Sequence, residues 1–185
     1  MFTASLQKHP IFIRYPRGAG EGVPMKESPQ MLEIGKAEVV KNYAQNRGLK
    51  VALFALGNMN KIARQAAQEL EKQGFDCAIV NARFFKPLDA GTTEFFGRSA
   101  DVVVTLEDHV LAGGYGTAVL ELFSEKRIDA PVVRIGWPDQ FIEHASSVDV
   151  LRQRHGITVA QVVARVKAEF TGQTGERPKV VPAVA

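Results

Sequence analysis

The sequence predicts an α/β protein, a three-layer α/β/α sandwich whose mostly parallel sheet has about five strands and one antiparallel edge strand. Short, continuously apolar runs alternate with longer segments in which apolar residues recur at helical spacing. The apolar runs lack the polar alternation of half-exposed strands, which indicates strands covered by helices on both faces. With 185 residues, of which 45% are hydrophobic, the chain can build one good-sized core.

The elements follow one another from residue 31 onward. An alternating stretch at residues 32–40 is expected to form the antiparallel edge strand. The buried strands are predicted at residues 51–56, 76–81, 101–106 and 131–135, and the helices at residues 59–73, 89–96, 116–126 and 159–170. Strands that alternate with helices in this way form a largely parallel sheet.

The chain is expected to divide into three parts. Residues 1–30 form an arm and linker, residues 31–170 form the domain, and residues 171–185 form a flexible tail. The arm carries a β-rich run at residues 11–15, followed by a connector rich in glycine and proline. Because a single strand cannot satisfy its own edges, we expect the arm to be mobile or to lie against another molecule.

The composition excludes several classes of protein. The net charge is +3 and basic residues are interspersed with acidic ones, so nucleic-acid binding is not expected. The lone cysteine, Cys77, lies in an apolar run and is interpreted as a small buried hydrophobe in a reducing compartment. No apolar stretch can cross a bilayer and residues 1–10 lack a signal-peptide core, so we expect a cytoplasmic protein without membrane contact.

Arg14 and Arg17 flank Pro16, which fixes the direction of the chain at the end of the predicted strand. Two guanidinium groups so placed are suited to bidentate binding of an oxyanion such as a phosphate. The same pattern also fits surface arginines that pair with carboxylates. The residues alone leave both interpretations open.

Gly113 and Gly114 lie between a predicted strand and a predicted helix. Free N–H groups at the start of that helix could bind an anion, but a tight turn explains the glycines equally well. Glu107, Asp108 and His109 follow the preceding strand, at the carboxyl edge where open α/β sheets bind ligands. Acid–base chemistry is possible there, although we favour a capping or inter-domain loop. The histidine and cysteine spacing predicts no metal site.

Five ordered segments of the chain resemble one enzyme family, the 1-deoxy-D-xylulose-5-phosphate synthases. The resemblance covers the end of that family's pyrimidine-binding domain and its transketolase-like C-terminal domain. The segments are residues 12–18 (F-I-R-Y-P-R-G), 34–36 (I-G-K), 83–89 (R-F-F-K-P-L-D), 105–116 (T-L-E-D-H followed by G-G-Y-G) and 135–144 (I-G-W-P-D-Q-F-I-E-H). Single segments are shared across the transketolase superfamily, whereas the ordered set is specific.

The resemblance implies part of a transferase that condenses pyruvate with glyceraldehyde 3-phosphate, using thiamine diphosphate and magnesium. The product would serve isoprenoid, thiamine and pyridoxal phosphate synthesis. By resemblance, Arg17 would bind the substrate phosphate, Arg14 would support it, and the domain would contribute to a homodimer. The sequence contains no G-D-G motif for the cofactor, so we expect a fragment that binds no cofactor and is inactive alone. Alternatives are a transketolase, a 2-oxoacid dehydrogenase beta subunit, or a non-catalytic regulatory module.

Overall fold

The computed structural model describes residues 1–16, 20, 22, 24, 27–44, 48–144 and 146–171. Within these residues, five strands form one sheet in the order β1-β3-β2-β4-β5. The strands are β1 (Glu38–Lys41), β2 (Lys50–Ala55), β3 (Asp76–Asn81), β4 (Val102–Val110) and β5 (Val132–Trp137). The helices are α1 (Phe2–Ser5), η1 (Gly57–Met59), α2 (Asn60–Glu71), α3 (Ala90–Ser99), α4 (Tyr115–Lys126), α5 (Val148–Arg154) and α6 (Val159–Thr171).

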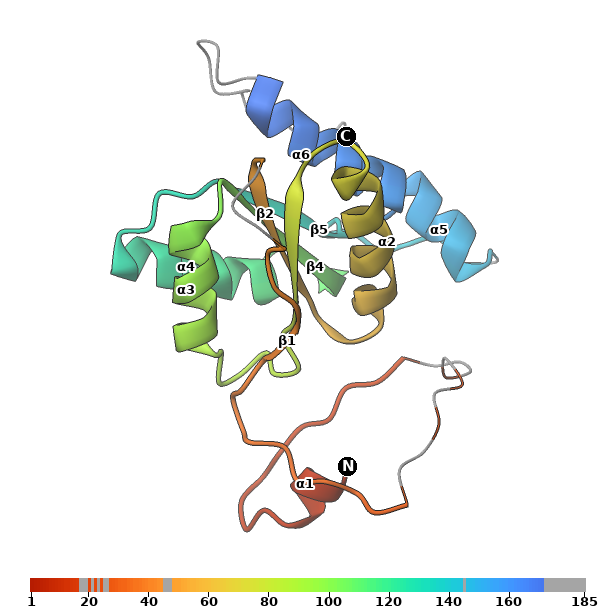
Figure 1. The fold of residues 1–185 in the computed structure, drawn as a ribbon. Helices are drawn as coiled ribbons and strands as arrows, with labels where there is room; N and C mark the ends of the chain where they lie inside the picture. Colours follow the sequence, from red (N-terminus) through yellow and green to blue (C-terminus); the bar gives the residue numbers. More distant parts are fainter. Residues whose placement is uncertain are drawn as a thin grey trace.

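Helices cover both faces of the sheet, so the predicted three-layer sandwich is confirmed (Figure 1). Alternate strand residues point to opposite faces. Leu53 and Ile79 pack in the cluster that includes α2 and α6, whereas Phe54 and Val80 pack in the cluster that includes α3 and α4. This double burial explains why the central strands are continuously apolar in the sequence.

The antiparallel edge strand is also confirmed, because β1 pairs antiparallel with β3 while β3, β2, β4 and β5 run parallel. It begins at Glu38 rather than near residue 32. The chain turns at Gly35, whose φ of +74° favours glycine, so the residues before it cannot continue the strand. Cys77 is fully buried, as predicted, and burial raises the pKa of its thiol to about 12.

Two predicted details are wrong. Residues 11–15 form no strand, because the described part of the chain places no neighbouring strand beside them. Residues 107–109 were expected in a loop, but β4 continues to Val110, pairing there with Trp137 of β5. The short helix α5 was not predicted, since it buries no residue and therefore shows no apolar stripe.

Asp89 fastens the start of α3 to the segment that leads into β1. Its carboxylate accepts hydrogen bonds from Thr92 N at 3.0 Å, Thr92 Oγ1 at 2.9 Å and Ala37 N at 3.0 Å. Burial alone would raise the pKa of Asp89, but these hydrogen bonds, with help from Lys36, lower it. The ionised carboxylate therefore caps the helix and holds the edge strand in place.

Replacing Asp89 by alanine is expected to lower the free energy of unfolding by about 2 kcal/mol, because three donors lose their acceptor. Asp89→Asn keeps an acceptor for the cap and should cost about half as much. Urea unfolding followed by circular dichroism measures both. The pKa of Asp89 is lower in the folded than in the unfolded state. The stability advantage of the wild type over Asp89→Ala is therefore fully present above the unfolded pKa of about 4 and is lost as the pH falls through the folded pKa. Equal stability of the alanine variant at pH 7 would contradict the capping role.

Candidate functional site

The candidate site lies at the carboxyl edge of the sheet, between β2 and β4. The chain leaves β2 toward β3 on one side, and β4 lies on the other side, so the strand order reverses here. Such a switch point is where open α/β sheets place their ligands. The N-terminal arm approaches the sheet from the same side, in the lower part of Figure 1.

Glu107 is fully buried beneath the first turn of α4. Its carboxylate accepts from Tyr115 N at 2.6 Å and Gly116 N at 3.0 Å. Burial raises the pKa of Glu107, although these two N–H groups and the charges of His109 and Arg134 oppose the shift. Glu107 thus caps the helix from inside the protein, which agrees with the capping role favoured from the sequence.

The glycines make room for this carboxylate. A Cβ atom on Gly114 would overlap Glu107 Oε2, and a Cβ on Gly116 would lie 2.5 Å from Thr105 Oγ1. Gly113 has a φ of +65° and no atom within 4 Å of its missing Cβ, so it serves the turn itself. Because Glu107 already occupies the first N–H groups of α4, Gly113 and Gly114 form a helix-capping turn.

Asp108 points to the opposite face of β4 from Glu107, as successive strand residues do. Its carboxylate accepts from Asn58 Nδ2 at 2.7 Å, Trp137 Nε1 at 2.6 Å and an Arg152 guanidinium nitrogen at 3.0 Å. Burial alone would raise the pKa of Asp108, but the Asn58 and Trp137 hydrogen bonds and the Arg152 charge lower it. The ionised carboxylate therefore joins η1, the end of β5 and α5 at one point.

The two carboxylates do not converge on a common atom, because one belongs to each face of the sheet. The His109 ring nitrogen Nδ1 lies 2.8 Å from Val110 O, on its own strand. Glu107, Asp108 and His109 therefore present no convergent pair of groups to one another, and the two carboxylates join neighbouring elements.

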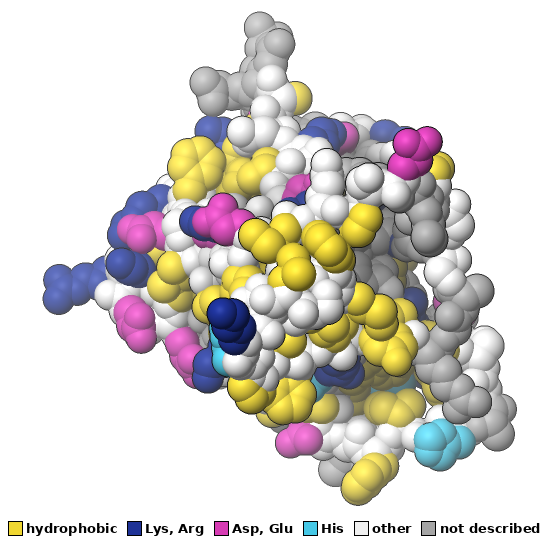
Figure 2. Space-filling model, turned by 90° about the horizontal axis from the view of Figure 1, so that it is seen from below, with side chains coloured by type: hydrophobic (Ala, Val, Ile, Leu, Met, Phe, Trp, Pro, Cys, Tyr) yellow, Lys and Arg dark blue, Asp and Glu magenta, His cyan; other side chains and the backbone are white. Residues whose placement is uncertain are grey.

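The arm reaches this edge through Arg14. Its guanidinium donates to the main-chain oxygen of Asp108 at 3.2 Å. Arg17, the other predicted phosphate ligand, lies outside the described residues. The arm leaves many apolar side chains in solvent, and Figure 2, which views the molecule from below, shows hydrophobic side chains gathered on this face. Phe12 is 99% exposed and Tyr15 is 70% exposed.

Sequence reasoning missed several residues of this edge. Asn58 and Arg152 carry no local signal, because their roles arise only when distant segments meet at Asp108. The last strand was predicted to end at residue 135, whereas Trp137 ends β5 and its ring packs edge-on against His155 at 5.5 Å. Arg83 adopts a φ of +56° and pairs with Glu38 at 2.8 Å. A strained non-glycine residue at such an edge is a functional candidate that dihedral angles reveal and the sequence does not.

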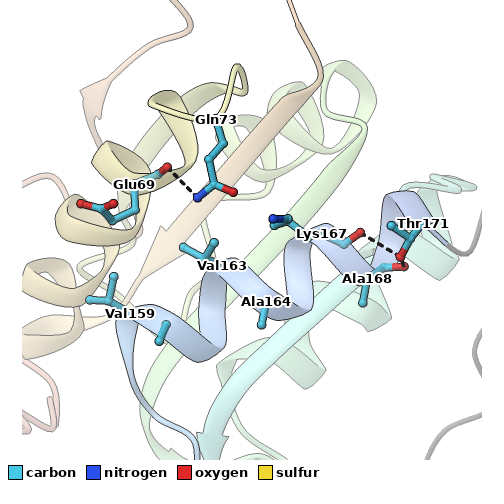
Figure 3. Close-up of a pocket in the computed structure, with 9 residues that line it drawn as sticks. Glu69, Gln73, Val159, Val163, Ala164, Lys167, Ala168 and Thr171 are labelled. Carbon is cyan, nitrogen blue, oxygen red and sulfur yellow. Dashed lines mark hydrogen bonds between the residues drawn. The ribbon is translucent and has the colours of Figure 1, made fainter.

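This edge carries no metal cluster among the described residues. No group of three or more histidine, cysteine or acidic residues among the described residues could hold a metal ion. An open groove lies instead between α2 and α6, lined mainly by small apolar side chains with Glu69, Gln73 and Lys167 at its rim (Figure 3). It contains none of the predicted site residues. Among the described helices, none has the length and apolar character needed to traverse a bilayer.

Comparison with known proteins gives consistent matches. Residues 35–162 match the family model described as transketolase, C-terminal domain. The 1-deoxy-D-xylulose-5-phosphate synthase of Methylacidiphilum infernorum is 51% identical over 159 residues, which are 86% of this chain and 24% of that protein. The enzyme of the same name from Acidobacterium capsulatum is 43% identical over 171 residues, which are 92% of this chain and 26% of that protein.

A solved structure described as a split-gene transketolase, inactive beta4 tetramer, has the same fold. It superposes with a TM-score of 0.68 at 36% identity and covers 81% of this chain and 47% of its own. The present chain spans about a quarter of the length of the curated relatives that it matches.

Two neighbouring glycines allow a matched test of the internal cap. Gly114→Ala is expected to lower the free energy of unfolding by about 3 kcal/mol, because its methyl group would displace the Glu107 carboxylate. Gly113→Ala should cost only about 1 kcal/mol, the strain of a left-handed alanine in open space. Chemical denaturation of both variants measures the difference. The reverse order would mean that Glu107 does not cap α4.

Proposed function

Because this chain belongs to the transketolase C-terminal domain family, we propose that it is the C-terminal domain of a 1-deoxy-D-xylulose-5-phosphate synthase. The observation that carries the proposal is its 51% identity to a synthase of that name across 86% of this chain. The whole enzyme would be a transferase that condenses pyruvate with glyceraldehyde 3-phosphate to 1-deoxy-D-xylulose 5-phosphate and carbon dioxide. Its product would feed isoprenoid, thiamine and pyridoxal phosphate synthesis.

The proposed boundaries place residues 1–30 at the end of the pyrimidine-binding domain and its linker. Residues 31–170 are then the C-terminal domain, and residues 171–185 are a tail. The arm would have its natural neighbours in the remaining three quarters of the enzyme, which agrees with its exposed Phe12 and Tyr15. The same surface, together with the domain, would contribute to a homodimer.

Arg17 and Arg14 are the residues to which we assign the substrate phosphate. A guanidinium group presents its donors in a planar fork that matches phosphate oxygens and keeps its charge at every working pH. Arg14 would support Arg17 while it is held against the carboxyl edge by Asp108 O. Two guanidinium groups on either side of Pro16 fit a small phosphorylated substrate.

Among the described residues, no set of side chains fits thiamine diphosphate and magnesium. The described residues contain no cluster for a divalent cation. The first N–H groups of α4, which could have received a diphosphate, are occupied by Glu107. We therefore assign both groups to other parts of the full-length enzyme.

A transketolase C-terminal domain is the second candidate, favoured by the likeness to the split-gene transketolase at 36% identity. That protein is described as inactive in its beta4 form, which agrees with our proposal that the domain needs partners for catalysis. The substrates separate the two candidates, because the synthase consumes pyruvate and releases carbon dioxide. Carbon dioxide release by the full-length protein from pyruvate and glyceraldehyde 3-phosphate would decide for the synthase.

In the full-length enzyme, Arg17→Ala is expected to raise the KM for glyceraldehyde 3-phosphate about thirtyfold, the effect of losing a charge-assisted contact of roughly 2 kcal/mol. The KM for pyruvate should stay close to that of the wild type, because pyruvate carries no phosphate. Steady-state kinetics with each substrate varied in turn measures both. Arg98→Ala, which removes an exposed arginine on α3 paired with Glu94, is the control. An unchanged KM for glyceraldehyde 3-phosphate in Arg17→Ala would refute the assignment.

The purified 185-residue chain is expected to show no turnover of pyruvate and glyceraldehyde 3-phosphate, because the cofactor ligands lie elsewhere. Isothermal titration with thiamine diphosphate and magnesium should likewise give no tight binding. The sample must first show a cooperative unfolding transition, which establishes that the domain is folded. Tight cofactor uptake by this chain would contradict the proposal.

A further inference from the structure

All acceptor atoms of Asp108 are engaged, and each contact leads to a different part of the molecule. Oδ2 accepts from Asn58 and Arg152, and Oδ1 accepts from Trp137. The main-chain oxygen accepts from Arg14 of the arm. One residue therefore connects η1, the end of β5, α5 and the arm.

The helix α5 itself contributes no side chain to the core. It buries no residue of its own, and the Arg152 side chain, only 16% exposed, reaches from it to Asp108. Phe141, in the loop that leads to α5, is fully exposed. The segment between β5 and α6 is anchored in the core by Ile157, just after α5. The ion pair and the contact of Trp137 with His155 hold α5 itself against the sheet.

The position of the arm also depends on Asp108. Arg14 binds a carbonyl oxygen, whose direction is fixed by the peptide planes at Asp108. The same residue is held by three side-chain donors, so their loss would loosen the backbone that presents this carbonyl to Arg14. The carboxylate also neutralises the Arg152 guanidinium, with which it forms an ion pair at 3.0 Å.

We propose that Asp108 is a positioning residue that sets where the arm lies over the carboxyl edge of the sheet. The inference rests on the proposed function in one respect: the arm is the segment to which phosphate binding by Arg14 and Arg17 is assigned. Asp108 acts through the seat of Arg14 and does not itself touch the substrate. We call Asp108 and its four donors, Arg14, Asn58, Trp137 and Arg152, the clamp. The clamp couples the position of the substrate-binding arm to the packing of α5 and the end of β5.

The chain supplies its own probes for a test. Trp137 is its one tryptophan and Cys77 its one cysteine. Because Cys77 is buried and the pKa of its thiol is about 12, a maleimide reacts selectively with a cysteine introduced at exposed Phe12. A fluorophore on Phe12→Cys then reports the motion of the arm by its anisotropy, and its distance from the clamp by energy transfer from Trp137.

Asp108→Asn is expected to release the arm, because the amide presents donors where Asn58 and Arg152 need acceptors. The ratio of molecules with a detached arm to molecules with the arm bound at the carboxyl edge should rise roughly tenfold. This is the factor expected from the loss of one charge-assisted hydrogen bond. Energy transfer and anisotropy should both fall, and Arg14→Ala should produce the same fall. The double variant should add nothing further, as expected for two residues that act on one seat.

Glu143→Ala is the matched control, because it removes another carboxylate that pairs with α5, through Arg154 at 3.6 Å, without touching the arm. Glu143→Ala should leave the anisotropy of the fluorophore and the energy transfer from Trp137 unchanged. If the anisotropy of the fluorophore also stays unchanged in Asp108→Asn, while the emission of Trp137 shifts, the proposal is overturned. Asp108 would then be a purely structural residue. If Asp108→Asn fails to fold by circular dichroism, Asn58→Ala and Arg152→Met remove its donors singly and must release the arm in part.

The outcomes also separate this inference from the proposed function. Arm release in Asp108→Asn, together with an unchanged KM for glyceraldehyde 3-phosphate in full-length Arg17→Ala, would retain the clamp and reject the phosphate assignment. An unchanged fluorophore anisotropy in Asp108→Asn, together with a raised KM for glyceraldehyde 3-phosphate in full-length Arg17→Ala, would reject the clamp and retain the phosphate assignment.

Discussion

The carboxyl edge of this domain depends on how one strand ends. β4 continues past the apolar core to Val110, although its pairing with β5 shifts register between Leu106 and Val110. Its two consecutive carboxylates lie on opposite faces of the sheet. Glu107 meets the first N–H groups of α4 on one face, and Asp108 meets Asn58, Trp137 and Arg152 on the other. A carboxylate removed from water needs donors around it, and both the buried Glu107 and the half-buried Asp108 have them.

This constraint explains why the glycines stand where they do. Glu107 is as deeply buried as the aliphatic residues before it, and its carboxylate fills the space that a side chain at residue 114 would need. Gly136 on β5 is subject to the same crowding, since its Cβ would lie 2.9 Å from His109 O. The glycine-rich turn and the end of β4 that carries Glu107 and Asp108 therefore form one structural unit, built from two segments of the chain.

The sequence predicted the sandwich because burial on both faces leaves continuous apolar runs, visible without any knowledge of neighbours. It also identified residues 107–109 and 113–114 as important, since carboxylates and glycines are conspicuous after a buried strand. It could not pair them, because the partners of Asp108 lie 50, 29 and 44 residues away. The strand expected at residues 11–15 failed for a related reason, since a strand exists only with a neighbour.

The two carboxylates also differ in what they permit. Glu107 is enclosed by backbone donors whose positions the helix fixes, so its contacts can change only if α4 unwinds. Asp108 is held by side chains from η1, β5 and α5, and the last of these is a helix with no buried residue. Side-chain contacts to a weakly anchored helix can break without unfolding the core. Of the two carboxylates, Asp108 is therefore the one through which the position of the arm can respond to its surroundings, while Glu107 keeps the sheet edge rigid beneath it.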